Sequence, residues 1–210
     1  MTFLNRLYCI SPRQHLNLST PQVAILVLVL LFCLPLKLQA EPSLSPDQLW
    51  QQLQQPGYLL MMRSARAPGF GDPANFDLTD CSTQRNLSNE GKDHARRIGD
   101  ALRQHHITDV QLYSSHWCRT QETARLLDLG TPTPLAALDK RPHSHDAQSS
   151  QPDALEQWIQ QQPLTTPVLL VTHQANITAI TGIHTRSGDL VVIRKNSNGS
   201  LVVAGKLYIH

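Results

Sequence analysis

Short apolar stretches that alternate with amphipathic helical patterns constrain the fold of this 210-residue chain more than any other feature. Three stretches have the length and composition of a buried β-strand, over residues 58–62, 110–113 and 167–171. A helical pattern follows each of them, over residues 88–106, 117–129 and 175–182. This alternation predicts a mainly parallel sheet with helices on both faces.

Further elements are predicted at both ends of this region. Ser45-Pro46-Asp47 combines an N-cap residue, a proline at the first helical position and an acid in the first turn, which predicts a helix ending at Pro56-Gly57. Near the C-terminus, an Asn198-Gly199 turn between residues 190–195 and 201–209 predicts a hairpin that adds antiparallel edge strands. We also expect a helix over 153–162, a short strand within 131–142 and a long loop over 64–86. Residues 41–210 are therefore predicted to form a single α/β domain.

Residues 1–40 have the pattern of a signal peptide. Arg6 and Arg13 precede an apolar run of 14 residues, 23–36. That run fits the apolar region of a signal and is short for a membrane span, which needs roughly 20 residues. Cleavage after Ala40 would give an exported protein, periplasmic or secreted. The alternative is an uncleaved leader that acts as a membrane anchor.

Two of the four cysteines remain after such a cleavage, Cys81 and Cys118. An oxidising compartment favours a disulfide between them. Two buried thiols are the alternative.

Charge argues against nucleic acid as a partner. Three of the 18 basic side chains lie in residues 1–40, which leaves 15 against 16 acidic side chains in residues 41–210. A nucleic-acid binder normally carries a basic face, and this sequence has no run of lysine or arginine. His143, His145 and Asp146 have the composition of a metal site but lie in a polar loop, so neither a metal nor a cofactor is predicted.

Polar side chains follow each predicted parallel strand. The first strand leads into Arg63-Ser64-Ala65-Arg66, the second into Ser114-Ser115 with Arg119 shortly after, and the third into Thr172-His173-Gln174. Ligands of open α/β sheets bind outside the carboxyl ends of the strands, so these segments should converge. The planar guanidinium of arginine and the N-termini of helices are both suited to binding phosphate. The sequence predicts a phosphate or phosphomonoester ligand.

Four segments resemble, in order, the landmarks of the histidine phosphatase superfamily: LLMMRSARAPG, NLSNEGKDHARRIGDAL, LYSSHWCRTQETARLL and VLLVTHQANITAITG. The resemblance spans about residues 57–205. It implies a phosphoglycerate mutase-like fold and phosphomonoesterase chemistry. Arg63 and Arg119 match the arginines that clamp the phosphoryl group, and His173 matches the second histidine of the pocket.

The resemblance leaves other roles open. The family uses an acidic residue to protonate the leaving group, for which Asp139 is the first candidate and Asp72 the rival. Arg66 either binds substrate or is a solvated loop residue. Gln174 either reaches the pocket or caps the helix that follows it.

Ser64 departs from the family pattern, because the residue after the first arginine is expected to be the nucleophilic histidine. A serine hydroxyl is a poor nucleophile until a base or a metal activates it. By analogy with serine proteases, loss of a nucleophile costs on the order of a million-fold in turnover. We therefore expect an exported pseudoenzyme of this fold that binds a phosphomonoester and is impaired in hydrolysing it. One alternative is an active phosphomonoesterase, for example on an envelope sugar phosphate, that uses Ser64 or water. The other is a non-catalytic interaction protein.

Overall fold

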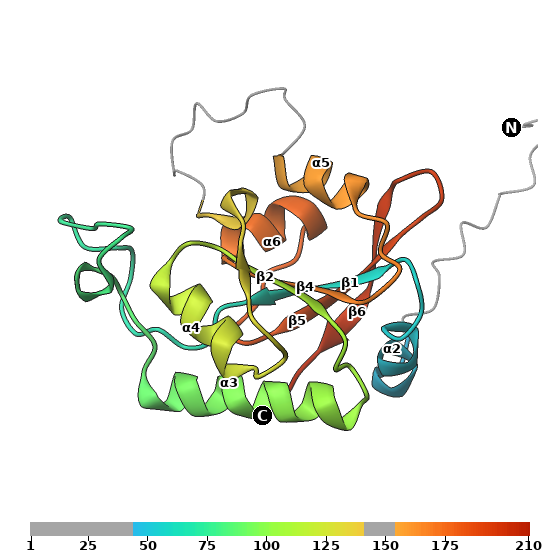
Figure 1. Cartoon of the computed structure of the whole chain (residues 1–210), viewed down its shortest axis with the longest axis horizontal. Coiled ribbons are helices and arrows are strands. Elements are labelled where there is room, and N and C mark those ends of the chain that lie inside the picture. The colour runs from blue at the N-terminus through green and yellow to red at the C-terminus, as the bar shows by residue number, and fades with distance from the viewer. Residues whose placement is uncertain (1–43, 141–153) are drawn as a thin grey trace, which may run out of the picture. The chain divides into compact units, whose positions relative to one another are not determined.

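The computed structural model describes residues 44–140 and 154–210, which belong to one compact unit. Its centre is a six-stranded sheet in the order β3-β2-β4-β1-β5-β6 (Figure 1). The strands are β1 (Tyr58–Arg63), β2 (Gln111–Ser114), β3 (Thr133–Pro134), β4 (Val168–Thr172), β5 (Leu190–Lys195) and β6 (Leu201–Leu207).

Strand directions confirm the predicted fold class. Strands β3, β2, β4 and β1 run parallel to one another, whereas β5 pairs antiparallel with both β1 and β6. The C-terminal hairpin therefore extends one edge of a parallel sheet. The predicted signal peptide and the tract with His143, His145 and Asp146 lie outside the described residues. No helix among the described residues is long and apolar enough to span a membrane.

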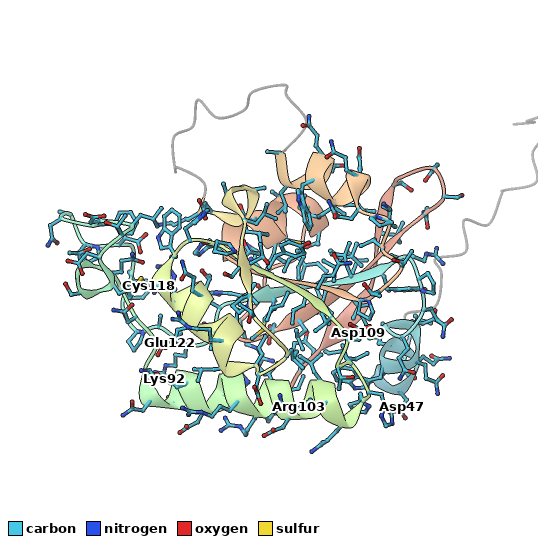
Figure 2. The ribbon with its side chains drawn as sticks, in the orientation of Figure 1. Asp47, Lys92, Arg103, Asp109, Cys118 and Glu122 are labelled. Atoms are coloured by element: carbon cyan, nitrogen blue, oxygen red, sulfur yellow. A yellow bond between two sulfur atoms is a disulfide. The ribbon has the colours of Figure 1, made fainter. Side chains whose placement is uncertain are left out.

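Helices cover both faces of the sheet, as the alternating pattern predicts. They are α2 (Pro46–Gln52), α3 (Asn89–Gln104), α4 (Cys118–Leu126), α5 (Ala154–Gln161) and α6 (Gln174–Thr181). Helices α2, α3 and α4 contribute to one apolar cluster, and α5 and α6 contribute to another on the opposite face (Figure 1). Figure 2 shows Lys92 of α3 and Glu122 of α4 on the facing sides of these two helices, where they form an ion pair of 2.9 Å.

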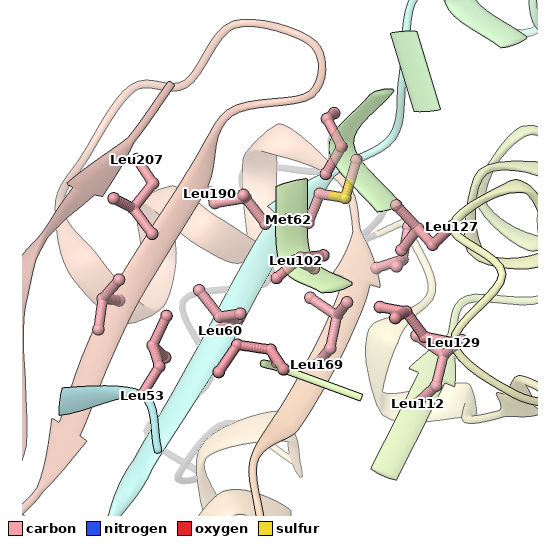
Figure 3. Packing of buried hydrophobic residues seen from close by; sticks show 14 of the residues in the cluster. Leu53, Leu60, Met62, Leu102, Leu112, Leu127, Leu129, Leu169, Leu190 and Leu207 are labelled. Carbon is pink, nitrogen blue, oxygen red and sulfur yellow. The ribbon is translucent and has the colours of Figure 1, made fainter. Parts of the chain in front are cut away.

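Strand β1 shows why a continuous apolar run is required at the centre of the sheet. Successive side chains of a strand point to opposite faces, and here both faces are covered. Leu60 and Met62 pack with the helices α2 to α4, whereas Leu59 and Met61 pack with α5 and α6. Figure 3 shows Leu60 and Met62 in the first of these clusters, between the side chains of the neighbouring strands and helices.

Local signals set most helix ends. Ser45 caps α2 in a capping box, since its Oγ accepts from Gln48 N while Gln48 Oε1 accepts from Ser45 N. Helix α4 ends at Leu126, a few residues before the predicted end, because Asp128 and Gly130 have positive φ angles of 53° and 106°. Such angles stop a right-handed helix.

The long loop over 64–86 is tied to the N-terminus of α4. A disulfide joins Cys81 to Cys118, with Cα atoms 5.7 Å apart, and Figure 2 labels Cys118 beside this loop. Gln84 Oε1 also accepts a hydrogen bond from Cys118 N at 3.0 Å. Of the two alternatives left open for these cysteines, the structure has the disulfide.

Candidate functional site

The polar residues that follow β1, β2 and β4 lie at one edge of the sheet. Ser64 N donates to Thr172 O at 3.0 Å, and Ser115 N donates to Val171 O at 3.1 Å, so the three strand ends are held together by backbone hydrogen bonds. The predicted convergence of the three segments is therefore present in the structure.

A cavity of about 490 Å³ opens at this edge. Five residues predicted for the site line it: Arg63, Ser64, Arg119, His173 and Gln174. Two cationic residues that the sequence reasoning missed, Arg85 and Lys140, also line it. No carboxylate stands among the lining residues in the described part of the chain, so the cavity is a cationic environment suited to an anion.

His173 is buried between a guanidinium and a hydroxyl. Arg119 Nη2 donates to His173 Nδ1 at 3.2 Å, and His173 Nε2 lies 2.8 Å from Ser115 Oγ. A guanidinium can only donate, so Nδ1 accepts, and the single proton of the neutral ring lies on Nε2 and is donated to Ser115. Burial, reinforced by the charge of Arg119, lowers the pKa of His173 to about 3. The imidazole is therefore a neutral donor at physiological pH.

Arg63 is held by the segment that follows α6. Its Nη1 donates to Thr185 O at 2.7 Å and to Gln174 Oε1 at 3.4 Å. Burial and the nearby charge of Arg85 lower the pKa of Arg63. These contacts fix the guanidinium at the cavity wall before any ligand arrives.

Arg119 shares a carboxylate with Lys140. Asp72 Oδ1 lies 2.9 Å from Arg119 Nη1, and Asp72 Oδ2 lies 2.9 Å from Lys140 Nζ. Burial lowers the pKa of Arg119, although Asp72 opposes that effect. For Asp72, burial raises the pKa of the carboxyl, but the hydrogen bond from Lys140 and the charges of Arg119 and Lys140 outweigh it and hold the pKa below its ordinary value.

Ser64 lines the cavity without a base beside it. Its side chain is buried, with 6% of the residue exposed. Within the part of the chain that the structure describes, no side chain is hydrogen bonded to its Oγ, and the Nε2 of His173 is engaged by Ser115 instead. The geometry therefore contains no general base that activates this hydroxyl.

The sequence landmarks hold the backbone around Ser64. Ala65 N donates to Thr123 Oγ1 at 3.1 Å, and Ser88 N donates to Arg66 O at 3.0 Å. Gly91 is required by this crossing, because a Cβ there would lie 2.2 Å from Arg66 O. The Leu-Ser-x-x-Gly pattern thus fixes the path of the loop that carries Ser64 into the cavity.

Three acidic and basic candidates lie outside the cavity lining. Arg66 does not join the other arginines, because its side chain is 59% exposed and pairs with Glu90 at 2.7 Å. Asp139 is not among the lining residues, and its carboxylate accepts hydrogen bonds from N and Nδ1 of His116. Asp72 contacts the lining only through its two ion pairs. The preference for Asp139 over Asp72 as the acid beside the site is not supported by this geometry.

Arg85 and Lys140 were missed because both lie in loops. Arg85 Nη1 donates to Ala67 O and Gly69 O at 2.9 and 2.6 Å, whereas its buried Nε has no partner among the described residues. The signal that could have indicated Arg85 is its place two residues before the Leu-Ser-x-x-Gly pattern. We also find no group of three His, Cys, Asp or Glu residues within 44–140 and 154–210 that could hold a metal ion.

Comparison with known proteins agrees with this geometry. Residues 79–141 match the sequence profile of the histidine phosphatase superfamily (branch 1), whereas no curated protein sequence matches the chain. The putative phosphohistidine phosphatase SixA from Agrobacterium tumefaciens has a similar structure, with a TM-score of 0.51 and 19% identity over 73% of this chain and 97% of its own. The protein histidine phosphatase SixA complexed with tungstate has a TM-score of 0.52 and 14% identity over 71% of this chain and 96% of its own.

A third similar structure is a variant of phosphoserine phosphatase from Entamoeba histolytica, with one histidine replaced by alanine and phosphoserine bound. Its TM-score is 0.50, at 13% identity over 71% of this chain and 95% of its own. At these identities the structural likeness shows the fold. The profile match is confined to residues 79–141.

Proposed function

We propose that this chain is an exported member of the histidine phosphatase superfamily that binds a phosphomonoester and hydrolyses it poorly. The observation that carries this proposal is the convergence of Arg63, Arg119 and His173 on one cavity, beside a Ser64 hydroxyl to which no base is hydrogen bonded within residues 44–140 and 154–210.

Phosphate is the ligand that this cavity suits best. Planar guanidinium groups recognise phosphoryl oxygens, and Arg63, Arg85 and Arg119 all line the cavity. One similar structure contains tungstate and another phosphoserine, which supports an oxyanion or a phosphomonoester as the ligand here.

Impaired turnover follows from the nucleophile position. The family resemblance places Ser64 where the phosphate-accepting histidine is expected, and its hydroxyl has no hydrogen-bonded base in the described residues. The similar phosphoserine phosphatase variant holds phosphoserine with one of its histidines replaced by alanine, which supports binding without full turnover here.

Protonation of the leaving group is also poorly provided for. Asp72 is the carboxylate nearest the lining, but its two ion pairs keep its pKa low, so it is ionised at neutral pH. A carboxylate in this state is a weak proton donor. We assign Asp72 to ion pairing with Arg119 and Lys140 rather than to acid catalysis.

Export is supported by the disulfide between Cys81 and Cys118, since disulfides persist in oxidising compartments. It is also consistent with the leader pattern of residues 1–40.

Hydrolysis of p-nitrophenyl phosphate tests the proposal, with the protein as it stands and with Ser64→His. We expect turnover close to background for the former and an increase of about a hundredfold or more for the variant, because an imidazole nucleophile is restored. Ser197→His, on the exposed hairpin turn, is the matched control and should change nothing.

Two results would overturn parts of the proposal. Fast hydrolysis by the unaltered protein, unchanged by Ser64→His, would show an active phosphomonoesterase that uses Ser64 or water. A melting temperature that phosphate, vanadate and tungstate all leave unchanged would indicate an interaction protein without a functional cavity.

A further inference from the structure

The cavity is lined by two chemically different sets of residues. The cationic set is Arg63, Arg85, Arg119 and Lys140. The other set has small side chains, namely Ala65, Ala67, Ala175, Thr178 and Ala179. Three of these come from α6, where positions 175, 178 and 179 lie on one face of the helix because residues three and four apart are neighbours. This face of α6 forms a wall of small side chains in the same cavity as the four cations.

The polar groups of this wall are already occupied. Gln174 Oε1 accepts from Thr185 N and Oγ1 at 2.9 and 2.8 Å, and its Nε2 donates to Thr178 Oγ1 at 2.6 Å and to Ile183 O at 3.3 Å. Thr178 Oγ1 in turn donates to Ile183 O at 3.1 Å. With these bonds formed, the amide and the hydroxyl have little capacity left for a ligand, and the wall presents mainly methyl groups.

Such a wall is a poor binding surface for polyhydroxylated ester groups. Burying a hydroxyl without a hydrogen-bond partner costs about 1–3 kcal/mol, which disfavours a sugar seated against it. Among the lining residues that the structure describes, none is Phe, Tyr or Trp, so the wall also has no aromatic platform for a sugar ring. His184 and Ser187 are the remaining polar residues of the lining.

We infer that the α6 wall of the cavity binds an apolar alkyl or aryl group, so that the preferred ligands are alkyl or aryl phosphomonoesters rather than sugar phosphates. This inference rests on the proposed phosphomonoester function of the same site. Each methylene removed from water contributes roughly fourfold to affinity, and a short alkyl chain should therefore raise affinity measurably over a bare phosphoryl group.

Phosphonates test the inference without depending on turnover, because their carbon–phosphorus bond is not hydrolysed. Affinities of the full chain for methylphosphonate, butylphosphonate and 2,3-dihydroxypropylphosphonate are measured by calorimetry. We expect butylphosphonate to bind about tenfold more tightly than methylphosphonate, given partial burial of the added methylenes. The dihydroxypropyl compound should gain little or nothing over methylphosphonate.

Ala179→Asn tests whether the preference for butylphosphonate arises at the α6 wall, since Ala179 is exposed on α6 and lines the cavity. It should reduce the butyl-to-methyl ratio of affinities at least threefold, whereas Ala179→Val should preserve that ratio. Ala154→Asn, at an exposed position of α5 outside the lining, is the control.

The outcomes separate the two proposals. Methylphosphonate and inorganic phosphate that both fail to bind would overturn the proposed function. Binding of both, with equal affinity for the methyl and butyl compounds or tighter binding of the dihydroxypropyl compound, would overturn the apolar subsite alone.

Discussion

Arg119 and His173 act as one unit, because Nη2 of the guanidinium donates to Nδ1 of the imidazole across 3.2 Å. This contact fixes the tautomer of the ring, and the proton on Nε2 is directed to Ser115. The positive charge of the cavity therefore resides on Arg63, Arg85, Arg119 and Lys140, while His173 is neutral. We therefore expect a substitution of Arg119 to change ligand affinity. A substitution of His173 should instead change the pH dependence of stability.

Arg119→Ala should weaken tungstate or phosphate binding by about tenfold or more, because a charged hydrogen bond contributes about 1.5–3 kcal/mol. The substitution also frees Asp72 from one of its two ion pairs. Equilibrium titration followed by thermal shift measures the change. Arg125→Ala, at an exposed position of the same helix, is the matched control, and equal loss in both variants would argue against a specific role for Arg119.

His173 should make stability decrease on acidification. Its pKa in the folded state is about 3, below the ordinary 6.5, so the unfolded chain binds more protons between these values. Stability from this group is therefore present above pH 6.5 and is lost as pH falls toward 3, by about 2 kcal/mol between pH 7 and pH 5. Urea unfolding at the two pH values should show this loss, and His173→Gln should reduce it. An unchanged pH dependence in the variant would mean that other groups are responsible.

The residues that the sequence located correctly are those that directly follow strands. Arg63, Ser64 and His173 could be predicted because neighbouring parallel strands bring their carboxyl ends to one edge, whatever the loops do. Arg119 followed from its place in the first turn of a helix with a clear apolar pattern. In each case periodicity fixes the position of the residue relative to the sheet.

Loop residues lacked such a constraint. Arg66 lies only two positions beyond Ser64, yet its carbonyl is held by Ser88 N and its side chain is drawn to Glu90. Asp139 follows a single 3-10 turn and pairs with His116, a contact between segments 23 residues apart that no local pattern reveals. Arg85 enters the lining through a loop that the disulfide and Gln84 fasten to α4. Long-range contacts decide where these side chains point.

The disulfide should contribute both stability and affinity. Closing a loop with a sequence separation of 37 residues corresponds to about 4 kcal/mol in the chain-entropy treatment. Arg85 lies four residues after Cys81, and Arg119 directly follows Cys118, so reduction should also loosen two of the four cations. We expect a lower melting temperature and weaker tungstate binding for the Cys81→Ser, Cys118→Ser double variant. A reductant that lowers the melting temperature of the unaltered protein should have no effect on this double variant. Loss of stability with unchanged tungstate affinity would show that the disulfide has a structural role only.

Asp72 and Asp139 should respond differently to neutralisation. The Asp72 carboxylate lies 2.9 Å from Arg119 Nη1 and 2.9 Å from Lys140 Nζ, so it competes with an incoming oxyanion for both cations. Asp72→Asn should therefore tighten tungstate binding several-fold, and the gain should shrink at high salt because screening weakens the competition. Asp139→Asn serves as the control, since that carboxylate pairs with His116 outside the cavity lining, and its anion affinity should equal that of the unaltered protein. Weaker binding in Asp72→Asn would show instead that the carboxylate is needed to position Arg119.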